Sequence, residues 1–207
     1  MTPGFFTTIE ILGTFSFAVA GAFAAMENRL DPFGVLILAF ATAIGGGTIR
    51  DILIGDLPVV WLQSNLTFWV ILIGALITLF FGTYLKKFDR MLFYFDAMGL
   101  GLFSVIGIQK GMLNGFGPGI CVMLGTITGC FGGVLRDVLL NNVPLLFRKE
   151  IYALASIIGG VFFLLLLKWG LDTKVATITA IIIVFVTRMV AVRLKLSLPL
   201  FYLKKPG

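Results

Sequence analysis

Apolar stretches long enough to cross a lipid bilayer follow one another along almost the whole chain. A membrane-spanning helix needs about 20 mainly apolar residues, and seven such stretches can be marked in the 207 residues. They cover approximately 6–26, 33–54, 66–85, 92–111, 117–140, 151–168 and 175–194. Only 13% of the residues are charged, whereas a soluble domain carries about 25%. The sequence therefore predicts an all-α integral membrane protein, with nothing left over for a soluble domain.

Basic residues between these stretches are divided unequally between the two sides of the membrane. With seven spans, one side receives eleven of them and the other side receives three. The larger set is Arg29, Lys86, Lys87, Arg90, Arg148, Lys149, Arg188, Arg193, Lys195, Lys204 and Lys205, and the smaller set is Lys110, Lys168 and Lys174. Basic loops stay in the cytoplasm. We therefore expect a multi-pass protein of the cell (inner or plasma) membrane with a cytoplasmic C-terminus and an external N-terminus. Since the net charge of +6 arises from such loops, it does not indicate a nucleic-acid partner.

A motif inside the second stretch recurs 86 residues later. The run GGTIRD at 46–51 returns as GGVLRD at 132–137, and this offset makes 17 of the 65 pairs between 10–74 and 96–160 identical. Each copy contains three spans, and because three is odd the second copy enters the membrane upside down. The sequence predicts a single membrane domain, 1–207. It comprises two inverted three-helix repeats at about 5–87 and 91–170, and a seventh, extra helix at about 174–195.

Glycine clusters stand inside the second and fifth stretches at equivalent positions of the two repeats. They consist of Gly45, Gly46 and Gly47 in the first repeat, and Gly132 and Gly133 in the second. Each Gly within a helix costs about 1 kcal/mol relative to Ala. Such clusters therefore predict a kink or an unwound turn, whose freed backbone groups are suited to bind ions. The alternative is that small residues only let two helices pack closely.

An Arg-Asp pair follows each glycine cluster and falls within the predicted span. Arg50 and Asp51 belong to the first repeat, and Arg136 and Asp137 to the second. A charge inside the membrane usually faces a cavity or a partner, so these four residues are candidate pore residues. Adjacent residues leave a helix about 100° apart, and we therefore expect Arg50 to pair with Asp137 and Arg136 with Asp51. The alternative role is a pair of bridges that fix the helices without contact to a permeant species.

Four further polar residues are weaker candidates. Glu10 and Asp96 stand near the start of the first and fourth spans, either as vestibule carboxylates that attract cations or as helix-start residues near the interface. Thr42 and Thr128 precede the glycine clusters by one turn. Their hydroxyls are available to an ion, or they bond back to their own helix, as Ser and Thr more often do in membrane helices.

The residue types that most enzymes and metal sites need are missing or scarce. The chain contains no His and only two cysteines, Cys121 and Cys130, both within one apolar stretch. It has no metal-ligand cluster and no phosphate-binding loop with its lysine. We therefore expect no enzymatic activity, no cofactor and no resident metal. The inverted repeat suits two classes of transport protein: an ion channel, and a secondary transporter of a small zwitterion such as glycine.

Together these motifs resemble the prokaryotic branch of the trimeric intracellular cation (TRIC) channel family. The runs that carry the resemblance are GGGTIRDIL at 45–53 with Pro58 and Trp61, YFDAMGLG at 94–101, and GGVLRDVL at 132–139 with Pro144. The resemblance implies a homotrimer in the membrane lipid, with one hourglass pore for K⁺ and Na⁺ in each seven-helix protomer. It also implies kinks at the two glycine clusters and a place beside the pore for the two Arg-Asp pairs. The same sequences have carried a "glycine transporter" label.

Overall fold

The structure, a computed structural model, describes residues 3–85, 90–147 and 151–196, which form seven long helices and two short ones. The long helices are α1 (Pro3–Glu27), α2 (Pro32–Ile54), α4 (Asn65–Leu85), α5 (Met91–Leu113), α6 (Pro118–Leu139), α7 (Ala153–Lys168) and α8 (Thr173–Arg193). The short helices are α3 (Val60–Gln63) and the 3₁₀ helix η1 (Leu145–Phe147). Six of the long helices are long and apolar enough to span a membrane, and α7, with 16 residues, is shorter. The predicted all-α membrane fold is confirmed.

Matched signals in the sequence begin α2 and α6 at equivalent positions of the two repeats. Each helix carries Pro at its first position, Pro32 in α2 and Pro118 in α6, where the missing N–H is not needed. Asp31 also caps α2, because its Oδ1 accepts a 2.7 Å hydrogen bond from the Gly34 N–H. At the other end of α2, Gly55 has a φ of 73°, the left-handed conformation in which glycine commonly ends a helix.

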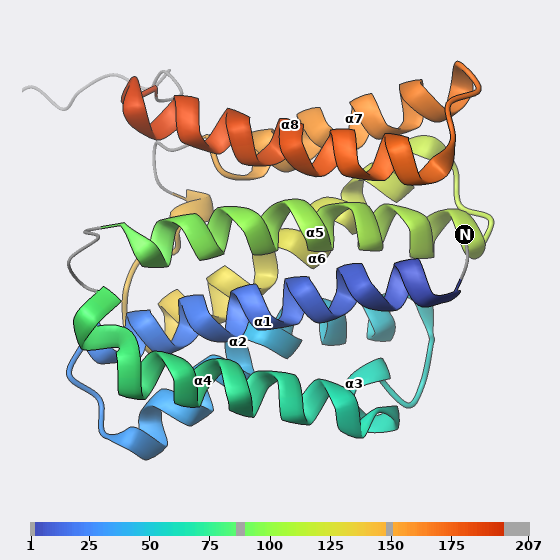
Figure 1. The fold of residues 1–207 in the computed structure, drawn as a ribbon. Helices are drawn as coiled ribbons and strands as arrows, with labels where there is room; N and C mark the ends of the chain where they lie inside the picture. Colours follow the sequence, from blue (N-terminus) through green and yellow to red (C-terminus); the bar gives the residue numbers. More distant parts are fainter. Residues whose placement is uncertain (1–2, 86–89, 148–150, 197–207) are drawn as a thin grey trace, which may run out of the picture.

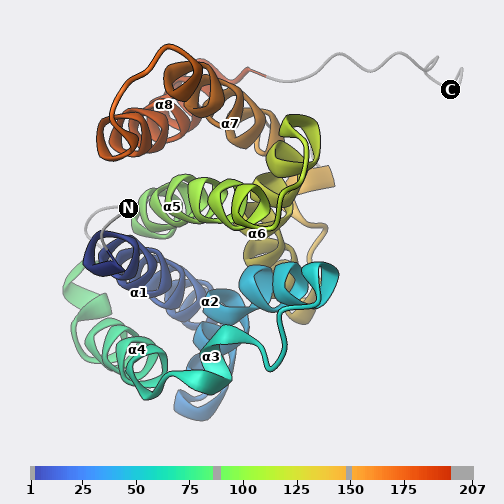
Figure 2. The same ribbon diagram turned by 90° about the vertical axis from the view of Figure 1, so that its right-hand side faces the viewer.

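The helices form two three-helix bundles with one helix added on the outside. Helix α1 packs against α2 and α4 in the first bundle, and α5 packs against α6 and α7 in the second. The bundles meet through α1 with α5 and α2 with α6. Helices α1 and α5 lie side by side and run in opposite directions at the centre (Figures 1 and 2). Helix α8 lies outside this pair of bundles and packs against α5 and α7.

The two ends of the bundle differ in charge. We call the end at which α1 begins the N-terminal face, and the end at which α8 ends the C-terminal face. Of the larger basic set, five residues are described and all lie toward the C-terminal face: Arg29, Arg90, Arg188, Arg193 and Lys195. The others, Lys86, Lys87, Arg148, Lys149, Lys204 and Lys205, lie outside the described residues. Lys110, Lys168 and Lys174 stand at the N-terminal face.

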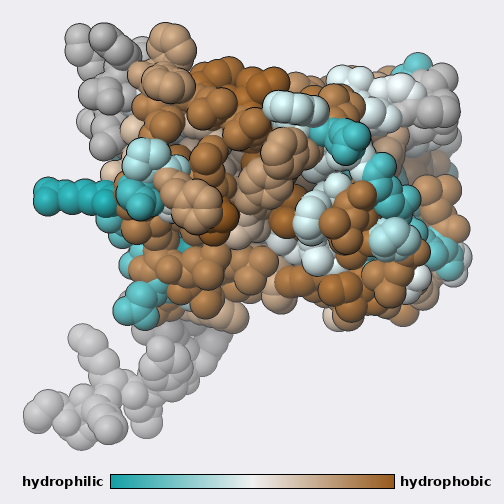
Figure 3. All heavy atoms as spheres, turned by 90° about the horizontal axis from the view of Figure 1, so that it is seen from below, coloured by the Kyte–Doolittle hydropathy of each residue, from teal (hydrophilic) through white to brown (hydrophobic). Residues whose placement is uncertain are grey.

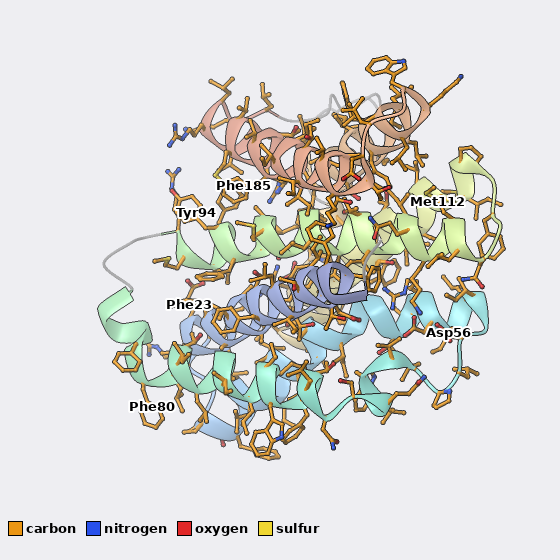
Figure 4. All side chains as sticks on the ribbon, turned by 45° about the vertical axis from the view of Figure 1, so that its right-hand side comes forward. Phe23, Asp56, Phe80, Tyr94, Met112 and Phe185 are labelled. Carbon is orange, nitrogen blue, oxygen red and sulfur yellow. The ribbon has the colours of Figure 1, made fainter. Side chains whose placement is uncertain are left out.

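The surface between the two faces is suited to lipid. Viewed from the α4 side, it is mostly apolar, with hydrophilic residues gathered toward the two ends (Figure 3). Large side chains such as Phe80 and Phe81 of α4 are exposed on it. Figure 4 places Asp56 and Met112 toward one end of the molecule, and Tyr94 and Phe80 toward the other.

The duplication in the sequence reappears as a pseudo-two-fold axis where α2 crosses α6. The Cα of Gly46 lies against the Thr128 carbonyl, and the Cα of Gly132 lies against the Thr42 carbonyl. An offset of 86 residues exchanges these two contacts, as it exchanges Phe17 with Phe103. Those two rings stack with centroids 5.3 Å apart and planes 8° apart. The two repeats therefore meet through one self-complementary contact.

The glycine clusters act through this crossing and do not unwind the helices. Helix α2 is continuous α-helix through Gly45, Gly46 and Gly47, and α6 is continuous through Gly132 and Gly133. Of the kink or unwound turn that we expected there, the unwound turn is therefore wrong, and the kink stays a prediction. The close-packing alternative describes Gly46 and Gly132. The physical reason is steric: the two helices approach so closely that a Cβ on either glycine would overlap a main-chain carbonyl of the other helix.

The crossing predicts how alanine substitutions will act. Gly46→Ala and Gly132→Ala each place a methyl group against backbone that cannot rotate away, so each should destabilise the protein by about 1–3 kcal/mol. Gly47→Ala is the matched control, because its nearest neighbour would be the Arg50 Nη2 at 3.8 Å. Thermal unfolding of the detergent-solubilised variants measures the difference. Equal melting temperatures for all three variants would contradict this packing.

Candidate functional site

The arginine of the first repeat is buried beside its own neighbour in the sequence. Arg50 Nε and Nη2 donate to the same Asp51 oxygen, Oδ1, at 2.9 and 2.7 Å. The other oxygen, Asp51 Oδ2, accepts from the Val60 N–H at the start of α3, at 3.0 Å. Both side chains are only 2% exposed. The Asp51 carboxylate therefore ties the arginine to the chain segment that follows α2.

The second repeat builds the same arrangement and adds a second carboxylate. Arg136 Nε donates to Asp137 Oδ1 at 2.9 Å, and Asp137 Oδ2 accepts from the Leu145 N–H at the start of η1, at 3.1 Å. In addition, Arg136 Nη1 donates to Asp96 Oδ1 of α5 at 2.6 Å. Asp96 is 1% exposed, so this ion pair is fully withdrawn from solvent.

The expected pairing across the repeats is therefore wrong. Arg50 contacts Asp51 rather than Asp137, and Arg136 contacts Asp137 and Asp96 rather than Asp51. Asp51 and Asp137 lie in the last turns of α2 and α6. There the returning chain supplies a main-chain N–H that holds each carboxylate in place. The long arginine side chain then turns around the helix to reach it, and this overcomes the angle of about 100° between adjacent residues.

Glu10 lies beside the first arginine, at a small cavity open toward the N-terminal face. The cavity has a volume of about 30 Å³ and is lined by Glu10, Thr14, Gly47, Arg50 and Asp51 among others. A second cavity of about 40 Å³ shares Glu10 and Thr14 with the first. Each has room for about one or two water molecules. Arg50 Nη1 is buried and has no hydrogen-bond partner among the described residues. The first repeat thus combines a half-buried carboxylate, hydroxyl groups and an arginine donor in a polar hollow.

The equivalent place in the second repeat is filled. A Cβ on Gly133, the counterpart of Gly47, would stand 2.9 Å from the Tyr152 Oη and 3.5 Å from Asp96 Oδ1. Tyr152, just before α7, is 1% exposed. The sequence did not predict a role for Tyr152, because the position 86 residues earlier is Leu66 and the repeat therefore does not mark it. No motif in the sequence marks Tyr152.

The two threonines bond back to their own helices. Thr42 Oγ1 donates to the Leu38 carbonyl and Thr128 Oγ1 to the Leu124 carbonyl, both at 2.6 Å. Their hydroxyls point toward α1 and α5, since a Cβ on Gly21 or Gly107 would collide with them. The structure therefore has the second of the two expected alternatives, in which both threonine hydroxyls bond to their own helix. Their carbonyls, and not their hydroxyls, line the crossing of α2 and α6.

An ion pair also lies at the N-terminal face. Lys110, in the last turn of α5, donates a hydrogen bond to Asp56 in the loop after α2. This hydrogen bond, together with the charge of the ammonium group, lowers the pKa of the Asp56 carboxyl below its ordinary value. The Asp56 side chain is 40% exposed, so the pair is screened by water and contributes less than about 1 kcal/mol.

The chain is similar to known membrane proteins and matches one family model. The family model described as "Glycine transporter" matches residues 7–83 and again 93–168. A membrane protein of Vibrio cholerae is 39% identical over 201 residues, which cover 95% of this chain and 83% of that protein. The inner membrane protein YadS of Escherichia coli is 37% identical over 201 residues, covering 96% of this chain and 97% of that protein.

Solved structures share the fold over nearly the whole chain. One is the TRIC trimeric intracellular cation channel orthologue from Rhodobacter sphaeroides, with a TM-score of 0.87, 33% identity, and coverage of 92% of this chain and 98% of that one. Another comes from a study of conductance through TRIC cation channels, with a TM-score of 0.86, 31% identity and complete coverage of both chains. The membrane location of the chain follows from these relatives and from its apolar helices.

The difference between the two carboxylates predicts unequal effects of isosteric substitution. Asp96→Asn leaves Arg136 buried with a single carboxylate, so it should destabilise the protein by about 3 kcal/mol. Glu10→Gln, at the equivalent position of the first repeat, should change stability by less than about 1 kcal/mol, because Glu10 is half-buried beside a cavity. Thermal unfolding in the same detergent compares the two variants. A loss of stability in Glu10→Gln as large as that in Asp96→Asn would contradict the asymmetry of the site.

Proposed function

The chain belongs to the family described as glycine transporter, which is the TRIC family, and from this premise we propose that it is a monovalent cation channel. In the proposal each protomer contains one pore for K⁺ and Na⁺, which runs between the inverted repeats along α2 and α6. The observation that supports this most directly is the burial of an Arg-Asp pair at equivalent points of both repeats, beside a carboxylate from α1 or α5.

The sign of the charge at both ends of the proposed pore favours cations. Near the N-terminal face, Glu10 and Asp51 accompany one arginine, Arg50. Near the C-terminal face, Asp96 and Asp137 accompany Arg136. With all groups ionised, each of these sets of three residues has a net charge of −1, while Lys110 adds a positive charge near the first set and Arg188 adds one near the second. A ring or vestibule with excess carboxylate attracts cations and repels anions. Arg136 bonds to both carboxylates of its cluster, and Arg50 bonds to Asp51.

The described conformation corresponds to a closed pore in this proposal. Between the two charged clusters, the close crossing of α2 and α6 leaves no room for a Cβ on Gly46 or Gly132. Beyond the crossing, Asp96 and Tyr152 fill the hollow beside Gly133. Conduction therefore requires the second repeat to open by a displacement of these side chains or of the helices that carry them.

The relatives and the distribution of charge support a proposed assembly and orientation. A TRIC orthologue is described as trimeric, and we propose the same for this chain, surrounded by membrane lipid. Apart from Arg50 and Arg136, five of the described basic residues lie toward the C-terminal face and three lie at the N-terminal face. By the positive-inside rule, the C-terminal face, with Tyr152 and Arg136, lies in the cytoplasm, and the cavity at Glu10 opens to the outside.

Flux from liposomes separates the proposed channel from a carrier. Liposomes that contain the purified protein should release K⁺ and Na⁺ faster than Cl⁻ or glycine. The efflux rates should differ on the order of tenfold or more, because the proposed pathway carries excess carboxylate. Isotope or fluorescent-dye efflux from matched liposomes, with protein-free liposomes as the control, measures all four solutes. Saturable glycine uptake without passive K⁺ release would show that the proposal is wrong and would favour a transporter of small zwitterions.

The position of Glu10 predicts a salt-dependent effect on conductance. Glu10→Gln removes the charge that concentrates cations at the N-terminal cavity, so unitary K⁺ current should fall roughly two- to threefold at about 0.01 M salt. The difference should disappear at about 1 M salt, where the Debye length is only ~3 Å. Glu27→Gln, at the exposed opposite end of α1, is the matched control and should not show this effect at the external entrance. Equal currents in Glu10→Gln and wild type at low salt would exclude Glu10 from the pathway.

A further inference from the structure

We propose that Arg188 of α8 is a positioning residue that holds Tyr152 across the C-terminal end of the pathway. This inference rests on the proposed function, because it assigns a role to the helix that lies outside the duplication. In this proposal α8 makes the two otherwise equivalent halves of the pore different, and it keeps the cytoplasmic half closed.

The Arg188 guanidinium lies over two aromatic rings. Its guanidinium carbon is 4.7 Å from the centroid of the Tyr152 ring and 5.1 Å from that of the Phe93 ring. Its Nη1 is also 3.5 Å from the Ile151 carbonyl, immediately before Tyr152. The residue is 0% exposed. A guanidinium stacked on an aromatic face is attracted to it, and more strongly when both are withdrawn from water. Arg188 therefore contacts both the ring and the main chain that position Tyr152.

The Tyr152 hydroxyl lies next to the charged cluster of the second repeat, and it has no hydrogen-bond partner among the described residues. Its Oη lies beside Gly133, close to where Asp96 meets Arg136. Ala155 and Val184 complete the apolar packing around the ring, together with Cys130. A displacement of α8 that removed Arg188 would therefore release the one aromatic side chain that covers this hollow in the described structure.

The first repeat has no equivalent of this arrangement. The residue that corresponds to Tyr152 is Leu66, which is 48% exposed and lines a cavity. Helix α8 lies after the second repeat, so Arg188 has no counterpart in the first. The open hollow at Gly47 and the filled hollow at Gly133 differ in these added groups, and also at paired positions such as Thr48 and Val134. The asymmetry of the molecule therefore follows Tyr152 and its contact with α8.

Cys130 provides a probe of this closure that does not depend on ion current. It corresponds to Ile44, which lines the cavity of the first repeat, yet Cys130 itself is only 1% exposed and packs with Tyr152. If Tyr152 leaves its place, Cys130 should become accessible to water. Cys121, also buried but in a separate cluster with Phe163, should stay protected and serves as an internal control.

The experiment measures the rate at which a cationic, water-soluble methanethiosulfonate reagent modifies each cysteine in proteoliposomes, read by peptide mass spectrometry. In Arg188→Leu, Cys130 should react roughly three- to thirtyfold faster than in wild type, the range expected for loss of a buried cation–π contact. Arg188→Lys keeps the charge without the planar stacking group, so its rate should be intermediate. Arg193→Leu, exposed in the last turn of α8, is the matched control and should react at the wild-type rate.

A double variant tests whether Arg188 and Tyr152 act through the same contact. Tyr152→Ala should expose Cys130 by itself, and adding Arg188→Leu to it should have no further effect, since the two residues act through one contact. Unchanged Cys130 reactivity in Arg188→Leu, or in Tyr152→Ala, would overturn the proposal. Equal acceleration at Cys130 and Cys121 would also overturn it, because Arg188 would then support the fold as a whole.

Single-channel recording of the same variants separates a failure of the proposed channel function from a failure of the proposed role of Arg188. A higher open probability with an unchanged unitary current in Arg188→Leu is the expected result. If wild type carries no cation current while Cys130 is still exposed selectively in Arg188→Leu, the proposed function fails but the positioning role of Arg188 stands.

Discussion

Two arginines inside a membrane domain impose the strongest constraint on this fold. On insertion scales a charged side chain at the centre of a spanning helix costs about 3 kcal/mol, and Arg50 and Arg136 are each at most 2% exposed. Each one is therefore accompanied by a carboxylate on its own helix, and that carboxylate is held in turn by a main-chain N–H of the returning segment. The ends of α2 and α6, the short elements α3 and η1, and the polar hollows beside them are all arranged around these two pairs.

The sequence predicts the elements and their symmetry well, because both depend on features that a single chain displays. The seven apolar stretches coincide with the seven long helices to within a few residues. The offset of 86 residues correctly relates contacts such as Gly46 with Thr128 and Gly132 with Thr42. Membrane thickness determines the length of the helices, and an odd number of spans per copy determines the inverted symmetry. Neither depends on how individual side chains pack.

What the sequence does not predict depends on packing. In the sequence, the glycine clusters suggested places where a helix unwinds. Only the position of the second helix shows that Gly46 and Gly132 allow two continuous helices to cross. The pairing of Arg50 with Asp51 was missed because the helix geometry alone opposes it, and the main-chain N–H of Val60 that holds the carboxylate lies nine residues away. Tyr152 and Arg188 carry no repeated motif, and their contact joins α7 to a helix outside the duplication.

In the proposed channel, the symmetric frame and its asymmetric closure give one duplicated unit a pathway with two different ends. Selectivity is assigned to carboxylates that both repeats share, and closure to the groups that only the second repeat and α8 contribute. The most direct test of this account is the reversal potential of unitary currents from purified protein in a planar bilayer between unequal KCl solutions. The account predicts discrete currents that reverse near the K⁺ equilibrium potential. Reversal near the Cl⁻ equilibrium potential, or no unitary current beside saturable glycine uptake, would contradict it.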